Sequence, residues 1–316
     1  MISGTVEASI DRQQVSETIP HICVCICTFK RGDLLLRLLR ALQTQRTNGQ
    51  FSYSIVVADN DALSSAAPVV AEFAAQSEMP VAYCVEARQN IALARNKALE
   101  NAGGDFIAFI DDDETPAADW LLRLFETHRT YGADGVLGPV KPSYECTPPD
   151  WMIKGGFFER PSYTTGTKLH WSETRTGNVL FKRSILRSGE PPFRAEFNVS
   201  HEDLDFFRRR TSEGCIFVWC DEAEVFEVVP SSRCNRTYLL KRALLRGSNF
   251  PKHPTGRLSG AIKSLIAVPC YLVALPFLAL FGQHLFFNYA IKICDHGSRL
   301  LALAGWPLIT NRRGIA

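Results

Sequence analysis

The sequence of 316 residues predicts an α/β fold, with a Rossmann-like, mostly parallel sheet and helices on both of its faces. Short apolar runs alternate with segments of helical spacing up to residue 140. Polar clusters follow three of these runs, at 28–31, 59–61 and 111–114. Ligands bind parallel sheets at the carboxyl ends of their strands, so these clusters indicate an active site.

The expected elements follow in order along the chain. Strands are expected at 22–27, 54–58, 81–85, 106–110 and 135–140, with helices between them at 33–42, 66–77, 90–101 and 118–130. Asp33 is expected to cap the first helix, and Gly132 to end the fourth. The segment 141–176 lacks periodicity, and such a long loop in a compact domain is usually functional. The later elements are strands at 178–181, 215–220 and 223–229, a helix opened by His201, and a basic helix at 236–247 ended by Gly247.

The acidic run after the fourth strand is the most informative motif. The strand 106–110 delivers Asp111, Asp112, Asp113 and Glu114 to one place. Four adjacent carboxylates repel one another, which raises some of their pKa values. A hard divalent cation such as Mg²⁺ or Mn²⁺ removes that cost and is often shared with substrate phosphates. A solvated acidic turn is the simpler alternative, and the two other polar clusters favour the active site.

Composition and cysteine usage exclude several classes of protein. The net charge of +2 gives no argument for nucleic-acid binding, and no nucleic-acid partner is expected. Cys23, Cys25 and Cys27 alternate along one strand, as small buried hydrophobes do, and the sequence contains no CxxC pair. We therefore expect reduced cysteines in a cytoplasmic protein rather than a zinc site. Residues 1–20 are expected to be a disordered lead-in without the apolar core of a signal peptide.

The C-terminal segment departs from this soluble composition. Residues 264–291 contain no Lys, Arg, Asp or Glu, and basic residues flank them on both sides. Pro269 and Pro276 are expected to kink a helix here. We expect residues 251–316 to form an apolar helical tail on the cytoplasmic face of the plasma membrane, peripheral or re-entrant. A buried C-terminal helical hairpin is the alternative.

Five short motifs in this order resemble those of glycosyltransferase family 2. They are Cys27–Arg31, Val57–Asp61, Arg95–Asn96, Ile110–Asp113 and His201–Asp203. That family comprises inverting enzymes with the GT-A nucleotide-sugar fold. The resemblance covers residues 21–250 and implies a nucleotide-sugar-binding half at 21–140 and an acceptor-binding half at 141–250. The apolar tail is similar to that of bacterial exopolysaccharide enzymes of the succinoglycan glucosyltransferase kind.

The resemblance implies a role for each matching residue in nucleotide binding. Thr28 and Arg31 would lie beside the nucleotide, and Asp59 would accept a hydrogen bond from the uracil ring. Arg95 would neutralise phosphate or hold the ribose.

The acidic motifs receive their implied roles from the same resemblance. Asp111 and Asp113 match the DXD motif, in which Asp111 contacts the ribose or the metal-bound diphosphate and Asp113 ligates Mg²⁺ or Mn²⁺. Asp111 is the second expected metal contact. Asp112 is counted with the donor-binding residues, without a role of its own. Asp203 matches the catalytic base, which would remove the proton from the attacking sugar hydroxyl.

The function implied is transfer of a hexose from a nucleoside diphosphate sugar, with UDP-glucose as the expected donor. The acceptor would be a lipid-linked oligosaccharide, and a β-glycosidic bond would form in bacterial exopolysaccharide biosynthesis. One alternative is a sugar-nucleotide nucleotidyltransferase, which needs a Gly-rich phosphate loop, whereas 28–33 contains only Gly32. Another is a non-catalytic membrane scaffold, which would be expected to have lost a motif acid.

Several residues keep alternative interpretations. Asp203 can cap its helix instead of acting as a base, and His201 can be structural or a pH-sensitive neighbour of that base. Arg242 and Arg246 lie one helical turn apart, where the family often carries Gln-x-x-Arg-Trp; that element is absent, which leaves a phosphate role for them open. Aromatic residues of the long loop can stack on sugars or belong to a core: Trp151, Phe157, Phe158, Tyr163 and Trp171.

Overall fold

A computed structural model of the protein describes residues 19–197, 201–252 and 257–309. The expected lead-in therefore lies almost wholly outside the described residues. A seven-stranded sheet has the order β3-β2-β1-β4-β8-β6-β9. Its strands are β1 (His21–Thr28), β2 (Ser52–Asp59), β3 (Val81–Val85), β4 (Phe106–Ile110), β6 (Gly135–Leu137), β8 (Asn178–Lys182) and β9 (Phe217–Trp219). Only β8 runs antiparallel to its neighbours in the pairs described, so the predicted mostly parallel sheet is confirmed.

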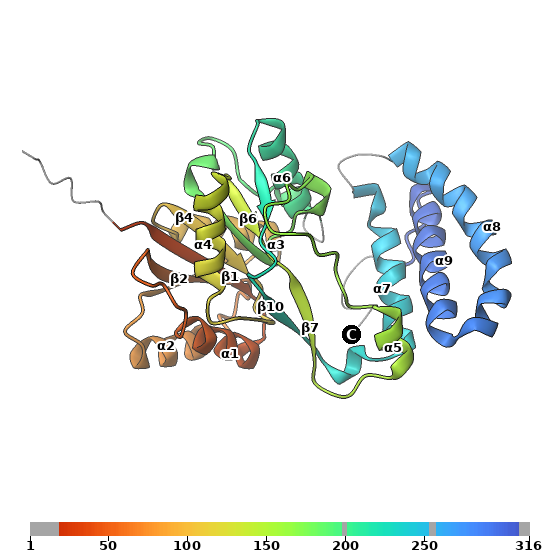
Figure 1. The fold of residues 1–316 in the computed structure, drawn as a ribbon, viewed down its shortest axis with the longest axis horizontal. Helices are drawn as coiled ribbons and strands as arrows, with labels where there is room; N and C mark the ends of the chain where they lie inside the picture. The colour runs from red at the N-terminus through yellow and green to blue at the C-terminus, as the bar shows by residue number, and fades with distance from the viewer. Residues whose placement is uncertain (1–18, 198–200, 253–256, 310–316) are drawn as a thin grey trace, which may run out of the picture.

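Helices cover both faces of this sheet, as predicted (Figure 1). They are α1 (Gly32–Leu42), α2 (Ala67–Gln76), α3 (Ile91–Asn101), α4 (Trp120–Tyr131) and α6 (Glu202–Ser212). Strand β1 divides the two cores by alternation, because Ile22, Val24 and Ile26 pack on the side of α1 and α4. Cys23 and Cys25 pack on the other side with α3 and α6. All ten cysteines are free thiols.

A second, three-stranded sheet contains β5 (Glu114–Pro116), β10 (Val225–Val229) and β7 (Val140–Tyr144), in that order. The sequence predicted one strand over 135–140, whereas the structure divides that region between the two sheets at Gly138. A Cβ atom at Gly138 would lie 2.3 Å from the carbonyl oxygen of Ala223, so the chain turns where only glycine fits. The short strand β5 places Glu114 opposite Glu227 of β10.

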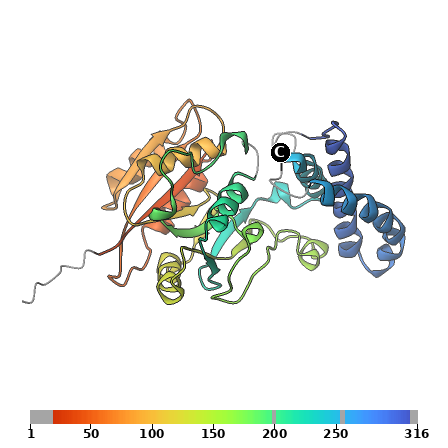
Figure 2. The same cartoon turned by 90° about the horizontal axis from the view of Figure 1, so that it is seen from above.

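Four helices form a separate group beside the sheets: α5 (Asp150–Gly155), α7 (Arg236–Ser248), α8 (Arg257–Phe281) and α9 (Gln283–Leu303) (Figures 1 and 2). The predicted division at residue 250 falls just after α7, yet α7 packs against α9. Gly247 was expected to end α7, and this was wrong. It lies inside the helix, which ends at Ser248. Glycine is required at this position because a Cβ atom there would be 2.3 Å from the carbonyl oxygen of Asp295 on α9.

The apolar C-terminal segment forms a helical hairpin of α8 and α9, and α8 is its exposed member. Helix α8 has a mean hydropathy of 2.2 over its most apolar window, of which 11% is buried, and by length and composition alone it could cross a membrane. It continues as one helix through Pro269 and Pro276. Ser264 of α8 bonds the His296 ring of α9 at 2.9 Å, which ties the two helices together. The hairpin alternative is therefore correct in topology, while the outer face of α8 is not buried.

The first helix begins differently from the prediction. Arg31 occupies the cap position of α1, without a side-chain capping bond, and Asp33 lies inside the first turn. An acidic side chain there still favours the positive end of the helix dipole.

Asn178 connects the large sheet to its surroundings. Its Oδ1 accepts a hydrogen bond of 2.7 Å from the indole N–H of Trp120, and its Nδ2 donates to the carbonyls of Pro139 and Ala223 at 3.0 and 2.7 Å. The side chain is fully enclosed, so loss of the amide leaves buried groups without partners.

We expect Asn178→Ala to lower the free energy of unfolding by about 3 kcal/mol, because several buried polar groups lose their hydrogen bonds. Urea unfolding followed by circular dichroism measures the change. Asn101→Ala is the control, since its amide makes one exposed bond to Lys97, and it should cost less than about 1 kcal/mol. Equal losses from the two variants would contradict this role of Asn178.

Candidate active site

The three polar clusters predicted at strand ends do meet. Strands β1, β2 and β4 are adjacent and parallel, with Thr28 opposite Asp59 in the register. Asp111 directly follows β4. The carboxyl ends of all three strands therefore lie at one edge of the sheet.

Asp112 is the organising carboxylate of this edge. It is 5% exposed, accepting a hydrogen bond of 2.8 Å from the Thr28 hydroxyl at one oxygen and one of 2.8 Å from Arg31 at the other. Lys30 has φ 55°, a left-handed conformation that turns the chain between β1 and α1 and places Arg31 over the acidic run. Burial raises the pKa of Asp112, and Arg31 and the Thr28 hydroxyl oppose this effect.

Asp113 and Asp111 differ in their surroundings. Asp113 accepts a hydrogen bond of 3.0 Å from the same Arg31 guanidinium. Burial and the neighbouring charge of Asp111 raise the pKa of Asp113 to about 6. The Asp111 side chain is 46% exposed, and its nearest cation is Arg95 at 3.8 Å.

Glu114 is a buried member of the run that sequence analysis left without a role. Its Oε2 accepts the backbone N–H of Asp111 at 3.1 Å, and its Oε1 has no partner among the described residues. Burial raises its pKa well above the usual range. Gly177 lies against it, since a Cβ atom there would be 2.9 Å from Glu114 Oε1 and 3.2 Å from an oxygen of Asp111. A larger residue at 177 would fill the space between the two carboxylates.

Arg95 joins the acidic run to the His201–Asp203 motif. It comes from α3, is 6% exposed and forms an ion pair with Glu202. On its other side Asp111 lies 3.8 Å away, and the charge of Asp203 also acts on it. The guanidinium lies 5.6 Å from the ring centre of Phe193. One cation therefore separates the two acidic motifs.

Asp203 lies in the first turn of α6 and is partly exposed. The cap position belongs to His201, which has φ 76° and no side-chain capping bond, so Asp203 is not the capping residue. One Asp203 oxygen accepts the N–H of Leu204 at 2.8 Å. Its neighbour Glu202 is buried. Burial raises the pKa of Glu202, and the charge of Arg95 opposes this effect. Glu202 Oε2 has no hydrogen-bond partner among the described residues.

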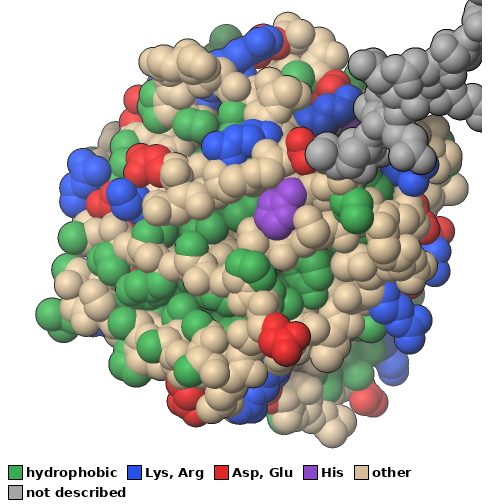
Figure 3. Space-filling model, turned by 90° about the vertical axis from the view of Figure 1, so that its left-hand side faces the viewer, with side chains coloured by type: hydrophobic (Ala, Val, Ile, Leu, Met, Phe, Trp, Pro, Cys, Tyr) green, Lys and Arg blue, Asp and Glu red, His purple; other side chains and the backbone are tan. Residues whose placement is uncertain are grey.

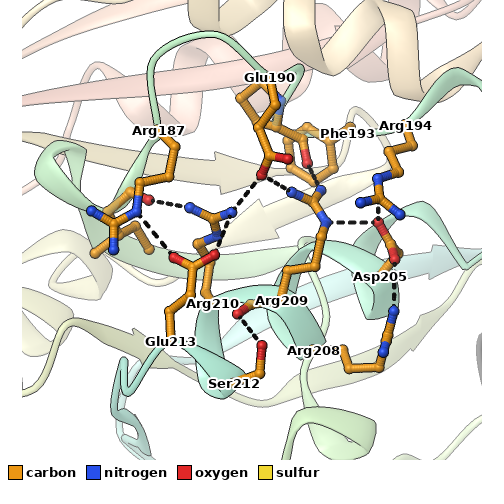
Figure 4. Close-up of polar contacts among 12 residues, drawn as sticks. Arg187, Glu190, Phe193, Arg194, Asp205, Arg208, Arg209, Arg210, Ser212 and Glu213 are labelled. Atoms are coloured by element: carbon orange, nitrogen blue, oxygen red, sulfur yellow. Dashed lines mark hydrogen bonds and ion pairs between the residues drawn. The ribbon is translucent and has the colours of Figure 1, made fainter.

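A network of arginines and acids holds α6 in place (Figure 4). Arg209 donates to Asp205 at 2.9 Å and to Glu190 at 2.6 Å. Arg210, also buried, donates to the same Glu190 at 2.7 Å. The loop 187–194 is thereby attached to α6, and Asp205, the third acid of the motif region, has a structural role.

The same loop is fixed on its other side by α3. Asn96 donates to the Phe193 carbonyl at 2.7 Å and accepts the Phe193 N–H at 2.9 Å. Asn90 donates to the carbonyl of Ala195 at 2.9 Å. The Arg95–Asn96 motif thus positions both the acids and the loop that precedes α6. Residues 198–200 lie outside the described residues.

Asp59 is placed at the predicted edge but is already engaged. It is fully buried, and its oxygens accept the N–H groups of Asp61 and Ala66 and the hydroxyl of Tyr83, at 3.1, 2.8 and 2.8 Å. Burial and this carboxylate raise the pKa of Tyr83 to about 12. In the structure Asp59 therefore fixes the loop after β2, and its contact with a uracil ring stays a prediction.

The carboxylates suit a cation that is shared with a diphosphate. Among the described residues no group of three or more acidic, His or Cys side chains converges as a metal site. Mg²⁺ characteristically uses one or two carboxylates together with substrate phosphates rather than an all-protein cage. Asp113, with Asp111 beside it, fits that donor set, and the glycine at 177 keeps a side chain away from Asp111. Arg31 would then share Asp113 with the cation or move toward the phosphates.

Arg160 is a site residue that the sequence analysis missed. It comes from the aperiodic loop and forms an ion pair with Glu227. The charges of Glu114 and Asp111 also act on it and raise its pKa. Of the two arginines of α7 for which a phosphate role was left open, Arg246 pairs with Asp295 at 3.2 Å, whereas Arg242 lies over the ring of Phe158, on the side of Arg160.

The aromatic residues of the long loop divide into two sets. Trp151 packs on Phe157 and on Phe287 of α9, at 5.5 and 5.1 Å between ring centres, so it belongs to the helical group. Tyr163 packs on Trp219 and Trp171 on His170. Stacking of these rings on a sugar stays a prediction.

Comparisons with known proteins agree on one family. A family model described as glycosyl transferase family 2 matches residues 23–189. The succinoglycan biosynthesis protein ExoM of Rhizobium meliloti is 38% identical over 237 residues, covering 73% of this chain and 74% of that protein. The glycosyltransferase AglE of Haloferax volcanii is 26% identical over 63% of this chain and 64% of that protein.

Two solved structures share the fold. One is a mannosyltransferase from Pyrobaculum calidifontis in complex with GDP-Man and Mn²⁺, with a TM-score of 0.59 and 18% identity over 92% of this chain and 87% of that one. The other is residues 1–349 of S. aureus TarS in complex with UDP, with a TM-score of 0.51 and 15% identity over 90% and 91%. At these identities they support the predicted fold.

We expect Asp112→Asn to weaken UDP binding about tenfold while leaving the required Mn²⁺ concentration unchanged, because Asp112 holds Thr28 and Arg31 rather than the cation. Asp113→Asn should instead raise that concentration at least about tenfold. Calorimetric titration of UDP at several Mn²⁺ concentrations separates the two effects. Glu72→Gln, a change of an exposed carboxylate on α2, is the control. An equal Mn²⁺ shift in both variants would make Asp112 a ligand.

Proposed function

The chain belongs to glycosyl transferase family 2, and from this premise we propose that it transfers a hexose to a lipid-linked saccharide with inversion of the anomeric centre. The donor is a nucleoside diphosphate sugar, with UDP-glucose as our specific proposal. The similarity to a protein named for succinoglycan biosynthesis supports a place in exopolysaccharide biosynthesis. The product is a β-linkage from an α-linked donor.

The position of Arg95 carries this proposal. Its guanidinium has Asp111 on one side and the Glu202–Asp203 pair on the other. A donor held at Asp111–Asp113 would therefore have its sugar directed toward Asp203 across a single cation. Transfer requires this adjacency, since the anomeric carbon must meet the acceptor hydroxyl and its base together.

Asp203 serves as the general base in this proposal. It removes the proton from the acceptor hydroxyl while that oxygen bonds to the anomeric carbon, and the bond from this carbon to the diphosphate oxygen breaks on the opposite face. The partial exposure of Asp203 leaves its carboxylate accessible to an acceptor hydroxyl, whereas Glu202 is buried with a raised pKa and bound to Arg95. Glu202 accordingly acts as a positioning residue for Arg95.

The leaving diphosphate gains negative charge during transfer. Arg95, Arg31 and Arg160 are the cations of this chain that surround its expected place. Asp113, with Asp111, would hold a divalent cation, which supplies further charge neutralisation of the diphosphate when bound. One carboxylate base is then sufficient, because no acid is needed at the leaving group.

The alternatives have less support. A nucleotidyltransferase needs a Gly-rich phosphate loop after the first strand, which this chain does not have, and the family model that matches is one of glycosyl transferases. A non-catalytic scaffold has no need to keep the acidic motifs on the two sides of Arg95.

We also propose that the outer face of α8 lies on the cytoplasmic surface of the membrane. Many of its large apolar side chains are more than half exposed: Leu265, Ile266, Leu272, Val273, Phe277, Leu280 and Phe281. An exposed apolar face of this size indicates an interaction surface, and a lipid-linked acceptor is found at a membrane.

Asp203→Asn is expected to lower kcat at least about a thousandfold while UDP affinity stays within about twofold, because the acceptor proton loses its base but the donor site is intact. Release of free nucleotide from a panel of UDP- and GDP-sugars, with membrane lipid extract as acceptor, measures turnover and identifies the donor. Glu72→Gln is again the control. Turnover near that of the unaltered protein would refute the base assignment.

Replacing Leu272, Phe277 and Leu280 together by Ser should weaken vesicle binding about a hundredfold or more, since burial of each side chain in lipid is worth about 1.5–3 kcal/mol. Co-sedimentation with phosphatidylglycerol vesicles measures this. Leu63→Ser, at an exposed position between β2 and α2, should bind as the unaltered protein does. Undiminished binding by the triple variant would exclude α8 as the membrane surface.

A further inference from the structure

Four arginines gather between the acidic run and the helical group. Arg160 and Arg233 both lie within ion-pair distance of Glu227, and Arg236 and Arg242 lie on α7. No carboxylate of the described residues lies within 4.0 Å of the guanidinium of Arg236 or of Arg242. Two of the four cations therefore share one carboxylate at this distance, and the other two have none. Such an excess of positive charge indicates an anion site.

The guanidinium of Arg236 is positioned by aromatic rings, and most of its N–H groups make no hydrogen bond among the described residues. Its guanidinium lies 4.7 Å from the ring centre of Phe287 and 5.5 Å from that of Trp151. Ring faces orient a guanidinium without using its N–H groups. The one hydrogen bond described for it runs from Nη2 to Gln283, at 3.1 Å. Since a guanidinium carries five N–H donors, the others remain for a ligand.

Arg242 has a similar environment further along the helix. It lies 5.4 Å from the ring centre of Phe158, whose ring stacks on Tyr238 at 6.3 Å. No hydrogen bond of its guanidinium is found within the described residues. Burial and the like charges of Arg160 and Arg246 lower the pKa of Arg242, and Tyr238 and Glu227 oppose this effect. Six residues separate it from Arg236, or about 9 Å along the axis.

These two arginines are separate from the donor site. Arg160 is the member of the cluster on which Asp111 and Glu114 act. The groups that act on Arg242 are instead Tyr238, Glu227, Arg160 and Arg246. Arg236 is further removed, because it contacts the beginning of α9.

The cluster also meets the apolar tip of α8. Phe277, Leu280 and Phe281, which are exposed, lie at the end of α8, and Gln283, the partner of Arg236, opens α9 two residues later. Figure 1 shows α5, the start of α7 and this turn close together. At the far end of the molecule acidic and basic side chains are mixed around a central hydrophobic area (Figure 3).

We propose that Arg236 and Arg242, supported by Arg233, bind the diphosphate of the lipid-linked acceptor. The inference rests on the proposed function. A polyprenyl diphosphate has its charge at the membrane surface and its chain within the lipid. The described arrangement matches this, with apolar side chains at the tip of α8, free guanidinium N–H groups behind them and the acidic run beyond. Guanidinium groups also suit phosphate oxygens better than lysines do, because each presents a planar fork of N–H donors.

Binding of farnesyl diphosphate in detergent, with UDP and Mn²⁺ at saturation, tests this inference without any sugar transfer. The unaltered protein should bind this probe while the donor site is occupied. Arg236→Gln and Arg242→Gln should each weaken it about tenfold, and the double variant at least about thirtyfold. UDP affinity should stay within about twofold in every variant.

Arg246→Gln is the matched control, because it removes an arginine of the same helix that already pairs with Asp295. It should leave binding of the probe within about twofold. Thermal unfolding midpoints of all variants show whether any loss reflects the fold, and Arg242→Lys should restore part of the affinity.

Three results would overturn the inference. The first is that the protein does not bind farnesyl diphosphate in the presence of UDP, and the second is that UDP and farnesyl diphosphate compete for binding. The third is that the arginine variants no longer bind phosphatidylglycerol vesicles but still bind farnesyl diphosphate. The second would assign the arginines to the donor and the third to ordinary anionic lipids. Failure of sugar transfer with intact probe binding would refute the proposed function alone.

Discussion

A buried guanidinium must be paired with carboxylates, and the arrangement of this site depends on the pairing of Arg95. Removal of a charge from water is costly unless opposite charges surround it. Arg95 meets this requirement with Glu202 on one side and Asp111 on the other, so α3, the end of β4 and the start of α6 are held together. The loop before α6 is then secured by the Asn96–Phe193 bonds and by the arginine network of α6.

The acidic run divides its work among four carboxylates because each has a different environment. Asp112 is enclosed and bound to Thr28 and Arg31, and Glu114 is enclosed, so that burial raises its pKa well above the usual range. Asp111 is half exposed, and Asp113 has a pKa of about 6. The outer members of the DXD motif are therefore the two that we propose for the donor and a cation, while the middle member maintains the loop after β1.

The sequence predicted much of the fold because hydrophobic periodicity is strong in strands and helices that are buried on known faces. Strands β3 and β4 were predicted with their observed bounds, and β1 and β2 within two residues at either end. Gly247 shows where local rules failed, since a glycine near a helix end indicates a cap, but here the approach of α9 requires it. Glu114 and Arg160 were assigned no role, because their positions follow from the small sheet and from a loop without periodicity.

The sequence by itself determined the α/β class, the strand-end location of the site, the family and the apolar C-terminal segment. These follow from periodicity and from short motifs, which depend on neighbours along the chain. Only the tertiary structure decided that Asp112 binds Thr28 and Arg31, that Asp203 is not a cap and that Arg246 faces α9 while Arg242 faces Arg160. Those outcomes depend on pairing between segments up to about a hundred residues apart, where burial and the need to neutralise each charge select the partner.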